Sequence, residues 1–98
     1  MFKDLITYEL AEGITFDHLK TVAEKVHKDW MKNQQGFLGW EINENQNGSY
    51  TDIVSWESKA HADASNEKMA NMPHGAEWMA CYKMETISAV KLLSKAHF

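Results

Sequence analysis

Arginine is absent from this sequence of 98 residues, although lysine occurs ten times and the formal net charge is −4. Bidentate recognition of phosphate groups and guanine bases uses the planar guanidinium group of arginine. An acidic chain without arginine therefore has neither the charge nor the side chains that nucleic-acid recognition needs, and we expect no nucleic-acid partner.

Cysteine, proline and long apolar runs are also scarce. Cys81 is the only cysteine, which excludes an intrachain disulfide and a cysteine-rich metal site. No apolar stretch approaches the roughly 20 residues of a membrane-spanning helix. The first ten residues lack the organisation of a signal peptide. We therefore expect a cytoplasmic protein that has no membrane partner.

The residues that are abundant are typical of a folded domain. Hydrophobic residues make up 44% of the chain, and four residues are tryptophan. The length indicates a single domain, residues 1–98. A chain of this size buries only roughly 65% of the surface that its unfolded form exposes, so a second core would stabilise it. The length alone therefore favours a dimer.

Alternation of apolar and polar side chains predicts three strands, at residues 4–10, 37–44 and 49–56. Asn47-Gly48 lies between the second and third of these segments and is a strong signal for a β-hairpin. One face of the third strand is expected to carry Tyr50, Asp52, Val54 and Trp56.

Helical periodicity predicts two main helices. The first is residues 15–33, capped by Thr15, and the second is residues 59–72, capped by Ser58 and ended by Pro73. Residues 75–82 fit one or two further helical turns. Residues 85–93 fit a strand or a helix by periodicity alone, but a final strand completes a βαββαβ order. We therefore predict an α+β, ferredoxin-like βαββαβ fold with an antiparallel sheet.

Several of the predicted strands carry apolar side chains on both faces. Leu5 points away from Ile6, and Val90 and Leu92 point away from Ala89. Two helices cover only one face of a four-stranded sheet, so the other face needs a second cover. The simplest cover is another copy of the chain related by a two-fold axis, and we expect a homodimer through the sheet faces.

The segments GFLGWEI, NGSYTDIVSWESKAH and MPHGAEW resemble the antibiotic biosynthesis monooxygenase (ABM-like) family of dimeric α/β barrels. The most specific piece is WESKAH, residues 56–61. It is similar to the junction between the third strand and the second helix of the small quinol-monooxygenase-like members. Pro73-His74 resembles the Pro-His pair near the end of their second helix, at a somewhat different spacing. The resemblance covers most of the chain and implies a dimeric α/β barrel.

The resemblance also implies a pocket between the helices and the sheet of each subunit, and oxidation of a small aromatic or quinol-like molecule by O₂ without metal or flavin. The haem-degrading branch of the same superfamily uses an asparagine on strand one, a tryptophan in helix two and a histidine near the end of that helix. Here strand one has Thr7 and Tyr8, and Ser65 stands at the tryptophan position. Only His74 matches, so haem degradation is disfavoured.

His61 and His74 are the candidate general bases, because imidazole gains and loses a proton near neutral pH. A cofactor-independent oxygenase needs such a base to form the electron-rich substrate anion that reduces O₂. Both histidines also have purely structural interpretations. His61 fits a solvated residue in the first turn of a helix, and His74 fits a surface corner after Pro73.

Aromatic side chains are the candidate substrate contacts. Trp56, Trp78, Tyr8 and Trp40 are candidate walls of a pocket for a flat ligand, although each also fits the core of the protein. A hydroxyl of Tyr8 or Tyr50 would polarise a substrate carbonyl. No sharp ligand spacing supports a metal site.

The sequence thus favours a cofactor-independent monooxygenase that acts on a small aromatic or quinol-like substrate. Two alternatives stay open. One is a non-catalytic dimer of the same fold that binds a small ligand, and the other is a haem-binding or haem-degrading protein.

Overall fold

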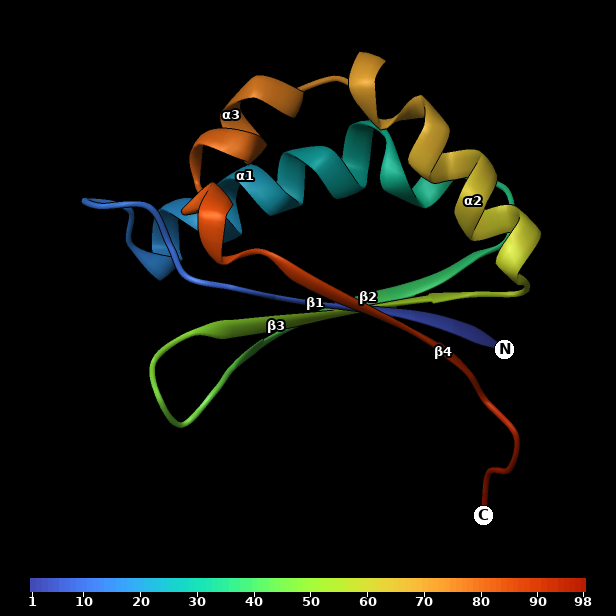
Figure 1. Cartoon of the computed structure of the whole chain (residues 1–98). Coiled ribbons are helices and arrows are strands. Elements are labelled where there is room, and N and C mark those ends of the chain that lie inside the picture. The colour runs from blue at the N-terminus through green and yellow to red at the C-terminus, as the bar shows by residue number, and fades with distance from the viewer.

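The computed structural model describes all 98 residues (Figure 1). One antiparallel sheet has the strand order β2-β3-β1-β4. Its strands are β1 (Phe2–Tyr8), β2 (Phe37–Glu44), β3 (Tyr50–Trp56) and β4 (Ser88–Leu93). The helices α1 (Phe16–Asp29), α2 (Lys59–Lys68) and α3 (Gly75–Ala80) all lie on one side of the sheet (Figure 1). The predicted α+β, ferredoxin-like βαββαβ arrangement is confirmed, and α3 is an addition to it.

Three predicted boundaries need correction. Strand β1 begins and ends two residues earlier than predicted, and Leu10 makes only an isolated bridge to Tyr82. Helix α1 ends at Asp29, because Trp30 leaves the helical region and the 3₁₀ turn η1 (Met31–Asn33) follows. Strand β4 begins at Ser88, because Met84–Thr86 form the 3₁₀ turn η3.

The second helix is also shorter than its periodicity predicted. Helix α2 ends at Lys68, and the 3₁₀ turn η2 (Met69–Asn71) replaces its last turn. Met72 is extended, as expected for the residue before a proline. The helix starts are where the sequence placed them: the hydroxyls of Thr15 and Ser58 accept hydrogen bonds from the backbone N–H groups of His18 and His61.

The core lies between the helices and the covered face of the sheet, which is the face that α1, α2 and α3 overlie. Leu19, Val22 and Val26 of α1 are fully buried against this face. The sheet contributes alternate residues, as the period of two requires. Its covered-face residues in the core are Phe2, Tyr8, Tyr50, Val54 and Trp56.

The opposite, uncovered face of the sheet carries an apolar row. In the register of the sheet, Ile53 of β3 lies beside Leu5 of β1, and Leu5 lies beside Val90 of β4. Val90 and its same-face neighbour Leu92 are 52% and 42% exposed. No element of this chain covers the row. No helix of the structure is long and apolar enough to cross a membrane.

Candidate functional site

A buried carboxylate lies at the centre of the covered face. Asp52 on β3 is 2% exposed. The hydroxyl of Tyr8 on β1 donates a hydrogen bond to its Oδ1 at 2.7 Å, and the indole N–H of Trp40 on β2 donates to its Oδ2 at 3.1 Å. Three adjacent strands thus supply one carboxylate and two donors. No cationic group forms an ion pair with this carboxylate.

Burial changes the acid–base properties of this group. Desolvation raises the pKa of Asp52 to about 6, although the hydrogen bonds from Tyr8 and Trp40 act in the opposite direction. Burial and the negative charge of Asp52 raise the pKa of the Tyr8 hydroxyl far above its usual range. Burial likewise raises the pKa of Tyr82. A buried carboxyl group whose pKa is raised toward neutral pH is a candidate for function, because perturbed pKa values cluster at functional sites.

Aromatic rings surround the carboxylate and extend toward the helices. The ring of Tyr8 lies 4.4 Å from that of Tyr82, and the ring of Tyr82 lies 5.9 Å from that of Trp78, measured between ring centroids. Trp78 is also 5.4 Å from Trp40. Three of the four predicted pocket residues, Tyr8, Trp40 and Trp78, are therefore brought together in one cluster.

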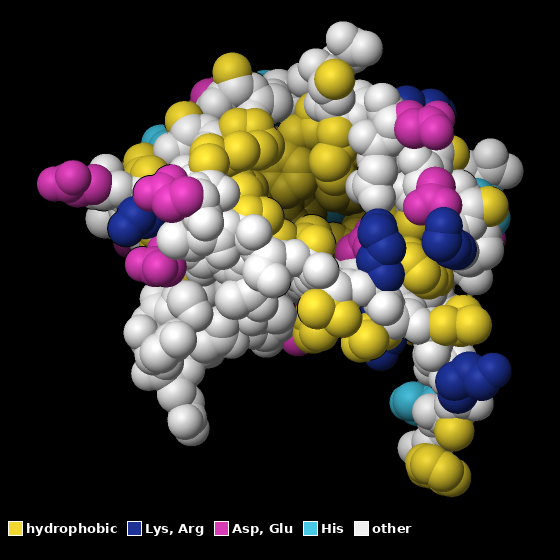
Figure 2. Space-filling model, viewed as in Figure 1, with side chains coloured by type: hydrophobic (Ala, Val, Ile, Leu, Met, Phe, Trp, Pro, Cys, Tyr) yellow, Lys and Arg dark blue, Asp and Glu magenta, His cyan; other side chains and the backbone are white.

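An apolar cavity adjoins this cluster on the helical side. It has a volume of about 280 Å³ and lies where η2 and α3 meet. Figure 2 shows a hollow lined with apolar side chains between α3 and α2. The lining residues are Met69, Ala70, Met72, Gly75, Ala76, Trp78 and Met79. Its size is close to the lower end of the range for small-molecule sites, and thioether and indole groups suit a flat apolar ligand.

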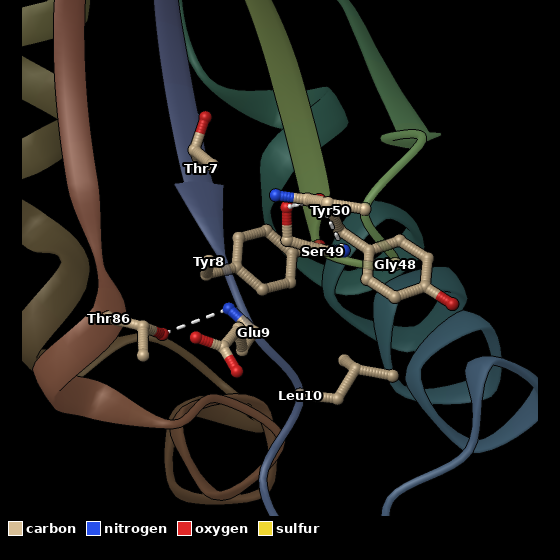
Figure 3. A pocket seen from close by; sticks show the side chains of 9 residues that line it. Thr7, Tyr8, Glu9, Leu10, Gly48, Ser49, Tyr50 and Thr86 are labelled. Atoms are coloured by element: carbon tan, nitrogen blue, oxygen red, sulfur yellow. Dashed lines mark hydrogen bonds between the residues drawn. The ribbon is translucent and has the colours of Figure 1, made fainter.

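A second, more polar cavity of about 610 Å³ opens at the end of the sheet (Figure 3). Tyr8 and Tyr50 reach it from neighbouring strands, and the backbone N–H of Glu9 donates to the hydroxyl of Thr86 at its edge (Figure 3). Hydroxyl, amide and carboxylate groups make up most of its walls. It therefore suits an apolar ligand less well than the cavity beside Trp78.

His74 lies between the lining residues Met72 and Gly75 in the sequence, but it is not itself among the residues that line a cavity. Its Nε2 is 2.6 Å from Oδ2 of Asp29 on α1, and its Nδ1 is 3.8 Å from Oε1 of Glu77. A carboxylate accepts only, so Nε2 donates and Nδ1 of the neutral ring keeps a lone pair. The hydrogen bond from His74 lowers the pKa of Asp29.

The backbone of His74 is unusual. It is the only non-glycine residue with a positive φ, at 63°, and it precedes α3 as the N-terminal cap residue. Histidine tolerates this left-handed region better than most residues, but the conformation still costs of order 1 kcal/mol. Strain of this kind persists where the surrounding structure imposes it, and functional sites are enriched in it.

His61 has a different environment at the start of α2. Its Nδ1 is 2.8 Å from the hydroxyl of Ser58, which also accepts the backbone N–H of His61. The ring packs against Gly36, where a Cβ atom would lie 2.3 Å from Cγ of His61. Gly36 also has a φ of +79°, so two independent constraints favour glycine there. His61 lines none of the cavities described here.

Trp56 lies apart from the aromatic cluster. It is 1% exposed and packs edge-on against Phe37 at 5.7 Å. It lines none of the described cavities either. No group of three or more His, Cys, Asp or Glu side chains is arranged to hold a metal ion.

Asp52 is the residue that the sequence reasoning overlooked as a functional group. The signal was present: Asp52 alternates with Tyr50, Val54 and Trp56 on the face expected to be buried. An acidic residue on such a face needs hydrogen-bond donors. The donors come from β1 and β2, far away in the sequence, so their identity depended on the sheet register.

Comparison with solved structures finds proteins of the same fold. No protein-family model matches the sequence, and no curated protein matches it either. Among solved structures, SnoaB from Streptomyces nogalater, a cofactor-independent oxygenase, superposes with a TM-score of 0.76. The two are 12% identical over 98% of this chain and 94% of SnoaB.

Two further structures have the same architecture. A structure described as an antibiotic biosynthesis monooxygenase has a TM-score of 0.68, with 13% identity over 98% of this chain and all of its own. The haem-degrading MhuD from Mycobacterium tuberculosis has a TM-score of 0.65, with 20% identity over all of this chain and 99% of its own. At these identities the likeness establishes the fold alone, and that fold is the one of the antibiotic biosynthesis monooxygenase-type proteins.

Proposed function

We propose that this chain is a cofactor-independent monooxygenase that oxidises a small aromatic or quinol-like molecule with O₂. The observation that carries the proposal is the apolar cavity beside Trp78, within a fold that a solved cofactor-independent oxygenase shares over 98% of the chain. In such chemistry the protein supplies a dry apolar cavity, a base and polar groups that orient the substrate. No flavin or metal is part of the proposal.

His74 is the preferred base of the two histidines. Asp29 holds its Nε2 proton, which leaves Nδ1 free to take a proton from a substrate hydroxyl. Glu77 lies on the Nδ1 side and would stabilise the imidazolium that forms. In His61, Nδ1 contacts the hydroxyl of Ser58 at the start of α2, and no lining residue of the apolar cavity adjoins His61 in the sequence. We assign His61 to the helix start and His74 to proton transfer.

The aromatic side chains differ in how directly they would contact the substrate. Trp78 lines the cavity and would stack on the substrate ring. Trp40 and Tyr8 support Trp78 from the sheet side through the ring contacts of the cluster. Trp56 would stabilise the sheet at the end of β3 that is remote from the cluster, where it pairs with Phe2 of β1.

The proposed assembly is a homodimer, located in the cytoplasm. The apolar row on the uncovered face supports it, because Ile53, Leu5 and Val90 form a continuous strip that water would otherwise contact. A second copy placed face to face buries both strips and encloses two sheets in one dimeric α/β barrel. Sedimentation at micromolar concentration tests this, and a monomer there would contradict it.

Oxygen consumption tests the catalytic proposal. The purified dimer is expected to consume O₂ with at least one member of a panel of quinols and anthrone-like compounds. His74→Asn should lower turnover about a hundredfold or more, the usual contribution of a general base, while asparagine still tolerates the left-handed backbone. His61→Asn is the matched control and should change turnover only a few-fold.

Three outcomes would count against the proposal in different ways. Equal losses in the two histidine variants would remove the assignment of the base. Substrate binding without O₂ consumption would indicate a ligand-binding dimer instead. A shift of the haem absorption band on titration with haem would favour the haem-binding alternative.

A further inference from the structure

The hydroxyl of Tyr8 makes a single hydrogen bond, and its acceptor is the Asp52 carboxylate at 2.7 Å. Tyr8 is 1% exposed, so water does not compete for this contact. Asp52 in turn receives no cation, only a phenol and an indole. A phenol and a carboxylate isolated together in a core form a pair through which a proton can move over a short distance.

The ring of Tyr8 also belongs to a continuous aromatic path. From Tyr8 the path runs to Tyr82 and then to Trp78, with centroid distances of 4.4 and 5.9 Å. Trp78 reaches the apolar cavity. From Trp78 a further step of 5.4 Å leads to Trp40. Tyrosine and tryptophan are the side chains most easily oxidised by one electron, and rings in near contact exchange electrons readily.

The path has a second opening to solvent. Trp40 lines a groove of about 310 Å³ between α1 and the edge strand β2. An electron can therefore leave the cluster toward the cavity at Trp78 or toward the groove at Trp40. Tyr8 lies at the end of the path that is remote from both exits, and it is the one ring of the path whose hydroxyl is bonded to a carboxylate.

Proton and electron loss from Tyr8 are coupled by its environment. Burial and the neighbouring charge raise the pKa of its hydroxyl so far that tyrosinate does not form at ordinary pH. A phenol that has lost an electron, however, becomes a strong acid. The proton then needs an acceptor within hydrogen-bond distance, and Asp52 is that acceptor.

We propose that Tyr8 is a one-electron redox site and that Asp52 receives its phenolic proton when the ring is oxidised. In the step, an oxidant at Trp78 or Trp40 gains one electron, which originates from Tyr8. The O–H bond of Tyr8 breaks, its proton bonds to Oδ1 of Asp52, and a neutral tyrosyl radical and a carboxylic acid result. One electron from a quinol or other phenolic reductant, together with the proton from Asp52, restores the O–H bond of Tyr8 and the carboxylate.

The class of oxidant follows from the cavity. A peroxyl radical formed on a bound aromatic molecule gains one electron along the path and one proton from water, and becomes a hydroperoxide. A high-potential metal complex in solution also accepts the electron, and it needs no bound substrate. The redox site thus goes beyond the proposed oxygenase activity, and its test needs neither substrate nor turnover.

The groups around the pair leave Asp52 as the acceptor. On β3, the hydroxyl of the neighbouring Tyr50 bonds to Glu44 on β2 instead. After α3, burial raises the pKa of Tyr82 and keeps it a neutral phenol, which is a far weaker base than a carboxylate. The side of α1 that packs on the sheet contributes the apolar residues Leu19, Val22 and Val26.

Flash-quench oxidation with ruthenium(II) tris-bipyridine and persulfate tests the proposal on the intact wild-type protein. We expect a tyrosyl radical, seen by transient absorption and by electron paramagnetic resonance, that is protected from solvent. Tyr8→Phe should abolish this long-lived signal. Tyr50→Phe is the matched control, since Tyr50 is a buried neighbour with its own carboxylate partner, and should retain it.

Two readouts separate a redox role from a structural one. Asp52→Asn should lower the radical yield about tenfold, the factor that corresponds to losing a hydrogen bond to a charged group. In the wild type the yield should fall as the pH drops below about 6, where Asp52 takes up a proton beforehand. This second readout needs no variant, so misfolding of Asp52→Asn would not prevent the test.

Either of two results would overturn the proposal. One is a radical signal that survives unchanged in Tyr8→Phe. The other is a wild-type yield that is independent of pH between 4 and 8 and also unchanged in heavy water. Loss of O₂ consumption with the radical intact would instead reject the oxygenase function and leave the redox site standing.

Discussion

Each face of the sheet carries one exception to the usual relation between polarity and burial. The covered face encloses the carboxylate of Asp52, which is 2% exposed, together with the hydroxyl of Tyr8. The uncovered face carries Leu5, Ile53 and Val90, and Val90 is 52% exposed. A carboxylate is thus buried within the apolar core under the helices, while an apolar row on the other face lies at neighbouring positions of the same strands.

The contrast indicates that the two faces serve different purposes. A buried carboxylate costs stability unless its donors are well placed, so its presence under the helices points to a functional site. An apolar strip facing water costs nothing when another copy covers it, so its presence on the other face points to assembly. Each purpose can be tested by changing one face and leaving the other intact.

The largest expected effect is on the covered face. Trp56→Ala should lower the free energy of unfolding by about 3–5 kcal/mol. It removes a nearly fully buried indole and leaves a cavity that the surrounding side chains cannot fill. Urea denaturation measures this. Ile53→Val, three residues earlier on the uncovered face, is the control and should cost less than about 1.5 kcal/mol. Equal losses of unfolding free energy in Trp56→Ala and Ile53→Val would contradict the expected difference in packing between the two faces.

The next effect is on assembly. Ile53→Lys should weaken the proposed dimer at least about 100-fold, because desolvating a charged side chain in an apolar interface costs several kcal/mol even when it has a partner. The register places Glu41 beside residue 53, so the new ammonium has a partner in the free chain and the monomer should keep its fold. Analytical ultracentrifugation and circular dichroism check the two halves of this prediction. A dimer of unchanged affinity would place the interface elsewhere.

The third effect is a pH dependence on the covered face. The pKa of Asp52 rises from its ordinary value near 3.8 to about 6 on folding, so the folded state binds this proton more tightly. The resulting stabilisation is complete below about pH 4 and is lost as the pH rises through 6. The stability of the wild type relative to Asp52→Asn should therefore fall by up to about 3 kcal/mol across this window.

Denaturation of both proteins at pH 4 and pH 7 measures this difference. Comparing the two proteins cancels the contributions of Asp29 and Glu77, whose lowered pKa values act in the opposite direction. A difference that does not change with pH would mean that the folded carboxyl titrates at its ordinary pKa.

The smallest effect concerns a polar pair on the uncovered face. The hydroxyls of Thr7 and Thr51 are 3.1 Å apart across β1 and β3. Thr51→Val should change the free energy of unfolding by no more than about 1 kcal/mol, the range for cross-strand pairs. A larger loss of unfolding free energy, measured by thermal denaturation, would show that this half-buried pair stabilises the fold as much as a contact on the covered face does.

Local patterns accounted for much of the fold and little of the site. Alternation, the caps at Thr15 and Ser58 and the Asn47-Gly48 turn identified the main elements before β4, because these signals act over a few residues, whereas β4 was assigned from the expected order of elements. Element ends were less predictable. The extended Met72 before Pro73 could be anticipated, whereas the early end of α1 at Trp30 depends on how that ring packs into the core.

The two histidines show where local reasoning stops. The sequence presented both as possible bases with equal chemistry. The ring of His61 meets Gly36 and Ser58, whereas the ring of His74 meets Asp29, which is 45 residues away along the chain. Only the contacts between segments distinguish a histidine that is held at a helix start from one that is bonded to a distant carboxylate.

The amino-acid sequence by itself determined the order of elements, the two-sided apolar character of the sheet and the absence of an arginine-based binding surface. These properties follow from periodicity and composition, which each segment carries alone. The tertiary structure alone decided that Asp52 would meet Tyr8 and Trp40, because the register of three strands joins residues that are 44 and 12 positions apart. Burial then moved the pKa of that carboxyl toward neutral pH, since desolvation depends on everything that surrounds a group and not on its neighbours in the chain.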